Sequence, residues 1–253
     1  MNRVAIALML LRLCTSLAVA DQSADTRYRE GLDHYRNAQY RQAIAAFEQL
    51  LDEGYASLDL YYNLGNAAYK NGDLGLSVLS YERALVRDPG NDDVRHNLRV
   101  VRARLRDRVD PIPLLFFVQW WEDLKTGSRP ETAFAWSLAF FTLFTVAAFV
   151  FFGIRQVTAR RIALVAGVLL LAASAAALAL VVQRTAELNA RRDAIVMRSE
   201  VAVRSAPDAT GVESFIVHEG LKVRILETRS GQHRIRLADG KTGWIEQAAL
   251  ARI

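Results

Sequence analysis

The stretch YYNLGNAAYKNGDLGLSVLSYERALVRDP, from Tyr61 to Pro89, decides the fold of the amino-terminal half of the chain. Apolar residues recur in it with helical spacing on both sides of Asn71-Gly72-Asp73, a sequence typical of a tight turn. Pro89 ends the second helical pattern because proline cannot continue a helix. The stretch therefore predicts a helical hairpin.

The chain resembles itself at a spacing of 34 residues, which is the tetratricopeptide period. Gly31 corresponds to Gly65, and Phe47 corresponds to Tyr81. In such a unit a small residue lets the first helix approach the second, and an aromatic residue on the second helix is expected to fill the gap between units. The run NDDVRHNLRVVRARLRD after Pro89 continues the spacing and becomes too basic to be buried, as expected of a capping helix. We predict two repeats and a cap over residues 24–109.

One side of the second repeat's first helix is expected to line a groove for a protein partner. Tyr62, Asn66, Tyr69 and Lys70 fall on that side, and His96 stands 34 residues beyond Tyr62. Aromatic rings, an amide and an ammonium group can together hold a peptide backbone and an acidic side chain. The alternative is that the two tyrosines only pack against the first repeat.

Residues 1–20, MNRVAIALMLLRLCTSLAVA, have the composition of a secretory signal peptide. Arg3 lies in a short basic start, an apolar run follows, and small residues precede the cleavage expected after Ala20. An uncleaved anchor is the alternative reading. Cleavage would remove Cys14, the only cysteine, which excludes thiol chemistry in the mature chain.

Two uncharged apolar blocks, residues 132–154 and 162–182, are each long enough to cross a bilayer as a helix. The loop between them, residues 155–161, carries Arg155, Arg160 and Arg161 and no acid, which predicts a cytoplasmic loop. Both soluble domains are then expected on the periplasmic side of a bacterial inner membrane. The net charge of +5 requires no nucleic acid as its explanation.

Residues 111–131 form an aromatic junction before the first apolar block. The run PLLFFVQWWEDL is too short to cross a bilayer. We expect an interfacial helix on membrane lipid, because aromatic and indole side chains favour the boundary between lipid and water. Its contact residues would be Phe116, Phe117, Trp120 and Trp121. The alternative is an apolar lid over the last repeat helix.

Residues 193–253 change to short alternating runs separated by turn sequences, including Ser230-Gly231 and Asp239-Gly240. Five or six strands in a small all-β barrel are predicted. The runs VAVRSAP, HEGLKVRIL and GKTGWIEQAAL resemble the bacterial SH3-like domain. The family often places a tryptophan where this chain has Gln232, in a groove that the resemblance links to peptidoglycan. Arg204 is the candidate contact, and Trp244 is expected in the core.

The ordered combination of these parts resembles the BatE proteins of the Bacteroides aerotolerance operon. The likeness rests on YYNLGNAAYKNGDLGLSVLSYERAL followed by DPGNDDVRHNL, and on the double-tryptophan junction. It implies an envelope scaffold that works beside von Willebrand factor type A membrane proteins and a MoxR-type ATPase, without catalysis of its own.

The residues predict neither an enzyme nor a metal or cofactor site. The four histidines are scattered, and no segment combines a nucleophile, a base and an oxyanion donor. The run DPGNDD lacks the ligand spacing of a calcium loop and suits a helix start. The principal hypothesis is a protein-interaction scaffold, and the alternative is a cell-wall module that binds peptidoglycan through the SH3-like domain.

Overall fold

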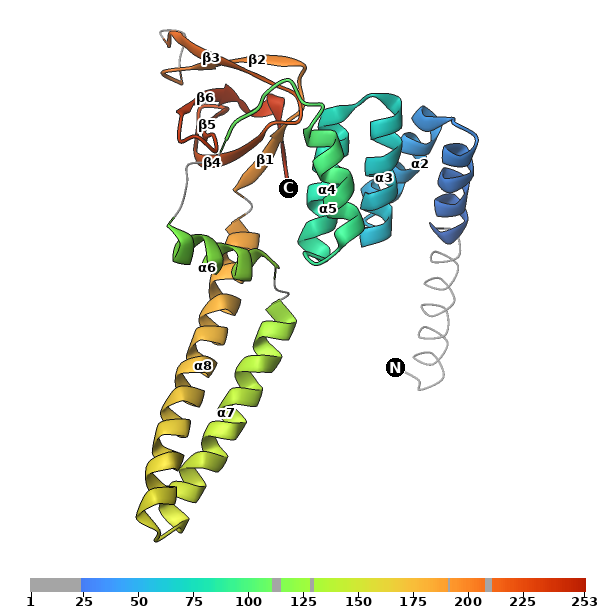
Figure 1. Ribbon diagram of the computed structural model, residues 1–253. Helices are drawn as coiled ribbons and strands as arrows, with labels where there is room; N and C mark the ends of the chain where they lie inside the picture. Colours follow the sequence, from blue (N-terminus) through green and yellow to red (C-terminus); the bar gives the residue numbers. More distant parts are fainter. Residues whose placement is uncertain (1–23, 111–114, 128–129, 191, 208–210) are drawn as a thin grey trace, which may run out of the picture. The chain divides into compact units, whose positions relative to one another are not determined.

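The computed structural model describes residues 24–110, 115–127, 130–190, 192–207 and 211–253 (Figure 1). The chain forms two compact units. One contains the described parts of residues 1–87, 91–111 and 193–253, and the other contains residues 88–90 and the described part of 112–192. The predicted signal peptide and the prolines Pro111 and Pro113 lie outside the described residues.

Five helices make up the amino-terminal half of the first unit. They are a helix over residues 24–36 and then α2 (Tyr40–Asp52), α3 (Leu58–Asn71), α4 (Leu74–Arg87) and α5 (Asp92–Arg102). Side chains cap the starts of α3 and α5: Ser57 accepts a hydrogen bond from the Leu60 amide, and Asn91 accepts one from the Val94 amide. Gly72 ends α3 in the left-handed conformation, with φ of 88°.

The close approach of α3 and α4 depends on Gly65. A Cβ atom at this position would lie 2.7 Å from Cε1 of Tyr81, whose side chain is fully buried. Phe47 fits against Gly31 in the same way in the first repeat. Each aromatic residue therefore packs against the glycine of its own hairpin, whereas the expected place was the gap between units.

The second unit contains two long apolar helices, α7 (Pro130–Gly153) and α8 (Val157–Ala190). Both are long and apolar enough to cross a membrane. The connection is shorter than the predicted loop of residues 155–161, because α8 begins at Val157 and already contains Arg160 and Arg161. The helix α6 (Phe116–Gly127) precedes them.

Seven strands form one antiparallel sheet in the carboxyl-terminal part of the first unit. They are β1 (Asp193–Val196), β2 (Glu200–Arg204), β3 (Glu213–His218), β4 (Lys222–Arg229), β5 (Gln232–Arg236), β6 (Thr242–Glu246) and β7 (Leu250–Arg252). Their order in the sheet is β3-β2-β6-β5-β4-β1-β7. The predicted turns are confirmed: Ser230-Gly231 joins β4 to β5, and Asp239-Gly240 lies between β5 and β6.

The sheet curls around a single apolar core to which six of its strands contribute buried residues. Alternate residues such as Val223 and Ile225 on β4 point into this core, and Ile235 on β5 lies opposite Ile225. The seventh strand arises because a 3-10 turn, η1 (Gln247–Ala249), reverses the chain so that β7 pairs with β1. This turn explains why five or six strands were predicted and seven are present.

Candidate functional site

A cavity of about 270 Å³ lies where the first helices of the successive repeats meet α5. From α3 it is lined by Tyr62, Asn66, Tyr69 and Lys70, the four residues selected from the sequence. The other described lining residues come from the helix over residues 24–36, from α4 and from α5: Tyr35, Tyr81, Asn97, Val100 and Val101. The structure therefore brings together four tyrosines, two amides and an ammonium group.

The polar groups of the cavity form a connected network around Asn66. The Tyr81 hydroxyl donates to Asn66 Oδ1 at 2.6 Å, and Asn97 Nδ2 donates to the same oxygen at 3.0 Å. Asn97 Nδ2 also lies 3.2 Å from the Tyr62 hydroxyl. Because both bonds occupy Oδ1, the Nδ2 group of Asn66 is the part of this side chain that remains to donate to a ligand.

Burial favours the neutral, hydrogen-donating form of two phenols in the cavity, those of Tyr81 and Tyr35. Loss of hydration raises the pKa of Tyr81 far above its ordinary value, and it also raises the pKa of Tyr35. Arg104 lies over the ring of Tyr69, 4.7 Å from its centroid. With Lys70, this guanidinium gives the Tyr69 end of the cavity a positive charge, and no acid is among the described lining residues.

Tyr62 and Tyr69 both line the cavity and pack against apolar side chains. They are half-buried and pack against the apolar cluster of α4 and α5, which differs from the expected packing against the first repeat alone. The Tyr62 ring lies 6.1 Å from that of Tyr81. Their remaining surface lines the cavity, so packing holds the rings in place without hiding them.

His96 is exposed and does not line the cavity, and its neighbour Asn97 takes that place. A tyrosine–asparagine pair that occurs in both repeats could have identified Asn97 as a lining residue. Asn63 Nδ2 donates to the Tyr28 hydroxyl at 2.6 Å, and Asn97 makes the equivalent bond to Tyr62. The two tyrosines stand 34 residues apart, as do the two asparagines. The period therefore identifies Asn97 once the asparagine is included in the comparison.

The aromatic residues of α6 separate into two groups. Phe116, Phe117 and Trp120 are exposed, and Phe116 keeps 84% of its surface. Trp121 is half-buried, and its Nε1 donates to Gln183 Oε1 of α8 at 3.2 Å. One tryptophan thus joins α6 to α8, while the other three side chains remain available to an apolar surface.

The basic residues at the tip of the hairpin are all exposed. Arg155 lies in the short connection, and Arg160 and Arg161 lie in the first turns of α8. Arg160 extends back over the ring of Phe151 on α7, 4.5 Å from its centroid.

In the sheet, Arg204 on β2 lies directly opposite Trp244 on β6. Arg204 is exposed, and Trp244 retains only 8% of its surface. Its strand neighbour Ile245 belongs to the apolar core of the sheet, whereas Trp244 is not among the residues of that core. Arg234 on β5 pairs with Trp244 on its other side.

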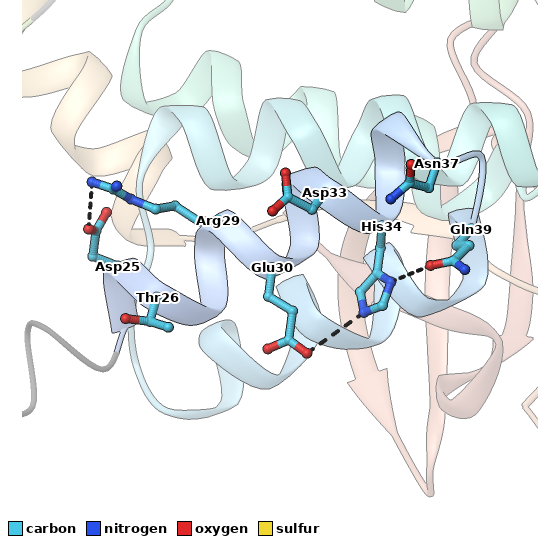
Figure 2. Close-up of a pocket in the computed structure, with 8 residues that line it drawn as sticks. All are labelled: Asp25, Thr26, Arg29, Glu30, Asp33, His34, Asn37 and Gln39. Atoms are coloured by element: carbon cyan, nitrogen blue, oxygen red, sulfur yellow. Dashed lines mark hydrogen bonds and ion pairs between the residues drawn. The ribbon is translucent and has the colours of Figure 1, made fainter.

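A second hollow, about 770 Å³ and widely open, lies on the polar side of the first helix (Figure 2). Its titratable side chains are close to partners: Asp25 lies 2.9 Å from Arg29, Glu30 lies 3.8 Å from His34, and Asp33 lies 3.1 Å from Arg36 outside the hollow. His34 Nδ1 also lies 2.6 Å from Gln39 Oε1. These pairs satisfy the side chains locally, so this hollow has weaker grounds as a binding site than the tyrosine cavity.

Comparison with known proteins agrees with the period and the helix packing. Residues 28–92 match the tetratricopeptide repeat family. The chain contains tetratricopeptide repeats. No curated protein matches the chain. Tetratricopeptide repeats are in general modules for binding other proteins, and the tyrosine cavity lies within and just beyond the matched residues.

Proposed function

We propose that this protein is a non-catalytic membrane scaffold whose tetratricopeptide repeats bind an extended segment of a protein partner in the tyrosine cavity. The observation that carries the proposal is the convergence of Tyr62, Asn66, Tyr69 and Lys70 on one cavity with Asn97. Rings fixed by packing bind a partner with little further loss of side-chain entropy. An amide donor and an ammonium group add direction and charge selectivity.

The partner segment is proposed to carry an acidic side chain. Lys70 and Arg104 flank Tyr69, and the described lining residues include no acid to compete for them. The free Nδ2 group of Asn66 suits a backbone carbonyl of an extended peptide, which offers an acceptor at every residue.

The wider setting of the proposal comes from the resemblance to BatE proteins. Residues 1–20 would direct export, α7 and α8 would fix the chain in the bacterial inner membrane, and both soluble parts would lie in the periplasm. The exposed aromatic residues of α6 would rest on membrane lipid. The partner would be a von Willebrand factor type A membrane protein within an envelope complex that includes a MoxR-type ATPase.

The double variant Tyr69→Ala with Lys70→Glu tests the cavity. It removes the half-buried ring of Tyr69 and reverses the exposed charge of Lys70. We therefore expect loss of partners that co-purify from detergent-solubilised membranes, with helix content unchanged. Mass spectrometry identifies the partners, and circular dichroism measures the helix content.

Arg41→Glu is the matched control, because Arg41 is an exposed base on α2 outside the lining of the cavity. This variant should retain every partner. Unchanged co-purification by the Tyr69/Lys70 variant would show that the cavity is not the docking surface.

The second candidate function is binding of peptidoglycan by the carboxyl-terminal sheet. It is supported by the juxtaposition of Arg204, Trp244 and Arg234, which places two bases around an indole. The indole is almost fully covered, which leaves the arginines as the contact groups. Loss of sedimentation with purified sacculi in Arg204→Gln, with retention in Arg229→Gln, is the expected result for this candidate.

A further inference from the structure

The side chain of Ile195 leaves the sheet to which its backbone belongs. It is fully buried, yet it packs in the cluster of α4 and α5 and not in the core of the sheet. Its neighbours Ala194 and Val196 point the other way, into the core of the sheet. Met197, Ala251 and Ile253 join Ile195 against the helices. One face of β1 and β7 is thus packed against the repeats.

Charged groups surround this apolar contact. Glu82 on α4 is buried, and its carboxylate accepts hydrogen bonds from Lys222 of β4 at 2.9 Å and from Arg102 of α5. A buried carboxylate requires such partners, since an unpaired one would lose its hydration without compensation. One carboxylate therefore ties two helices and a strand together.

A second polar contact lies just beyond α5. Asp107 accepts from the backbone amide of His218 at 2.6 Å, and its other oxygen lies 2.7 Å from Nδ1 of the same histidine. Leu105, buried in the helical cluster, lies against Gly220 in the turn after β3. On the other side, Arg83 of α4 donates to the backbone oxygen of Arg252 at 2.7 Å.

We propose that the sheet, and not α5 as expected from the sequence, is the terminal cap of the repeat array, and that the cap holds α5, one wall of the tyrosine cavity, in its binding position. A stacked array exposes an apolar face at its last hairpin and needs a cap with a polar outer surface. Here the sheet covers that face with Ile195 and presents its other strands to solvent. Val101 of α5 belongs to the same cluster as Ile195 and also lines the cavity, so the two sites share one packed element.

A designed disulfide tests the contact directly. A Cβ atom built on Gly75 of α4 would lie 3.6 Å from Cβ of Glu219, within the range of about 3.5–4.5 Å found in disulfides. In a Cys14→Ser background, Gly75→Cys with Glu219→Cys should cross-link on mild oxidation of the full chain in membranes, with a reductant-sensitive shift in gel mobility. Ala45→Cys with Glu219→Cys is the control, because Ala45 is exposed on α2. Absence of the cross-link in the first pair, or its equal formation in the control, overturns the proposal.

Hydrogen exchange of the full chain in detergent measures what the cap does for the repeats. Ile195→Asp should speed exchange in α4 and α5 more than about tenfold while the core strand β5 stays protected, because it places an unpaired carboxylate in the shared cluster. Ile216→Asp is the matched control, since Ile216 is exposed on β3 of the same sheet and should change nothing. Unchanged exchange in α4 and α5 would show that the repeats do not need the sheet.

The role of the cap in partner binding rests on the proposed function, and it is tested by an experiment separate from cross-linking and hydrogen exchange. Ile195→Asp should lose the same co-purifying partners as the Tyr69/Lys70 variant. If exchange rises but the partners remain, the sheet does not control the cavity. If neither variant loses partners, the cavity itself is not the binding site. The cross-linking and exchange experiments then still test whether the sheet packs against the repeats and stabilises them.

Discussion

Gly65 and Tyr81 form the tightest contact between α3 and α4, and Gly65→Ala tests its energetic weight. The new Cβ would meet the Tyr81 ring at 2.7 Å, and this ring is buried and tethered to Asn66 by its hydroxyl. We expect a net loss of about 1–3 kcal/mol in the free energy of unfolding, since such overpacking exceeds the gain in helix propensity. Denaturant titration of the full chain in detergent, followed by circular dichroism, measures it.

Gly90→Ala serves as the comparison for that substitution. A Cβ at Gly90 would meet Asp88 Oδ1 at 3.6 Å, an ordinary contact. Its stability should change by less than about 0.5 kcal/mol. Equal effects of the two substitutions would mean that the ring of Tyr81 moves freely and that the close approach at Gly65 is not required.

His233 gives the sheet a dependence on pH. Burial, and then the charge of Arg252, lower the pKa of His233 below its ordinary value, so the folded state holds the ring neutral beside Thr228. The unfolded chain binds a proton at about pH 6.5, before the folded one does. The free energy of unfolding should therefore fall as pH is lowered through about 6.5, until the folded ring is also protonated.

His233→Gln should reduce this loss of stability between about pH 7.5 and pH 5, because glutamine keeps a polar partner for Thr228 without titrating. Thermal midpoints of the full chain at the two pH values measure the change. His96→Gln replaces an exposed histidine and should retain the wild-type dependence. An unchanged dependence in the His233 variant would assign the acid sensitivity to other groups.

The residues that could be predicted at this scale were those fixed by the repeat period. The period selected Gly65, Tyr81 and the cavity-lining side of α3, because one helix presents the same side at every fourth or third residue. The place of Asn97 was not predicted, because a spacing of 34 residues counted from Tyr62 leads to His96. Its hydrogen bonds to Tyr62 and Asn66 depend on where α5 packs, which a spacing does not specify.

The α7–α8 hairpin is joined by two reciprocal hydrogen bonds between serines. Ser137 Oγ donates to the Ser174 backbone oxygen at 3.1 Å, and Ser174 Oγ donates to the Ser137 backbone oxygen at 3.0 Å. Both side chains are buried between the helices. Small residues permit the close approach, and hydrogen bonds across it stabilise helix association in lipid.

Ser137→Ala and Ser174→Ala should each destabilise the hairpin by about 0.6 kcal/mol, because each removes one donor. The effect of the double variant should differ from the sum, since the two Oγ atoms also lie 3.3 Å from each other. Denaturation by sodium dodecyl sulfate, followed by circular dichroism, provides the midpoint. Thr142→Val is the control, since the Thr142 hydroxyl bonds to Leu138 in its own helix. A double variant as stable as the wild type would show that the two serines do not stabilise the hairpin.

The elements themselves were largely predictable, and the differences have local causes. The apolar blocks predicted both long helices, and α8 continues past Val182 to Ala190 through the polar run that follows, whose composition also favours a helix. In β1, Ala194, Ile195 and Val196 are all buried, whereas a strand with one solvated face would alternate. That unbroken apolar run was the one sequence signal that both faces of β1 are covered. The partner on the second face could not be read from it.

At the scale of the whole molecule, one unit is assembled from chain segments on both sides of the hairpin. Residues 24–110 and 193–253 pack together through Ile195 and Glu82, while α7 and α8 come between them in the sequence. If both helices cross the membrane, the short connection places their outer ends on the same side, which this packing requires. The membrane topology and the fold of the first unit therefore depend on each other.

Reporter insertions in the full chain test this topology. Alkaline phosphatase fused after Ile253 should be active, since that enzyme works only after export, and phosphatase inserted at Gln156 should be inactive. Green fluorescent protein at the same two positions should give the opposite result. This expected orientation rests on the excess of arginine near the tip, because Arg155, Arg160 and Arg161 favour the cytoplasm. Replacing these three arginines by glutamine should reduce the difference in phosphatase activity between the two positions, whereas Arg198→Gln and Arg224→Gln in the sheet should not.

Equal phosphatase activity at both positions would show that the hairpin does not cross the membrane. An active enzyme at Gln156 with an inactive one at Ile253 would preserve the packing of the first unit but place it in the cytoplasm.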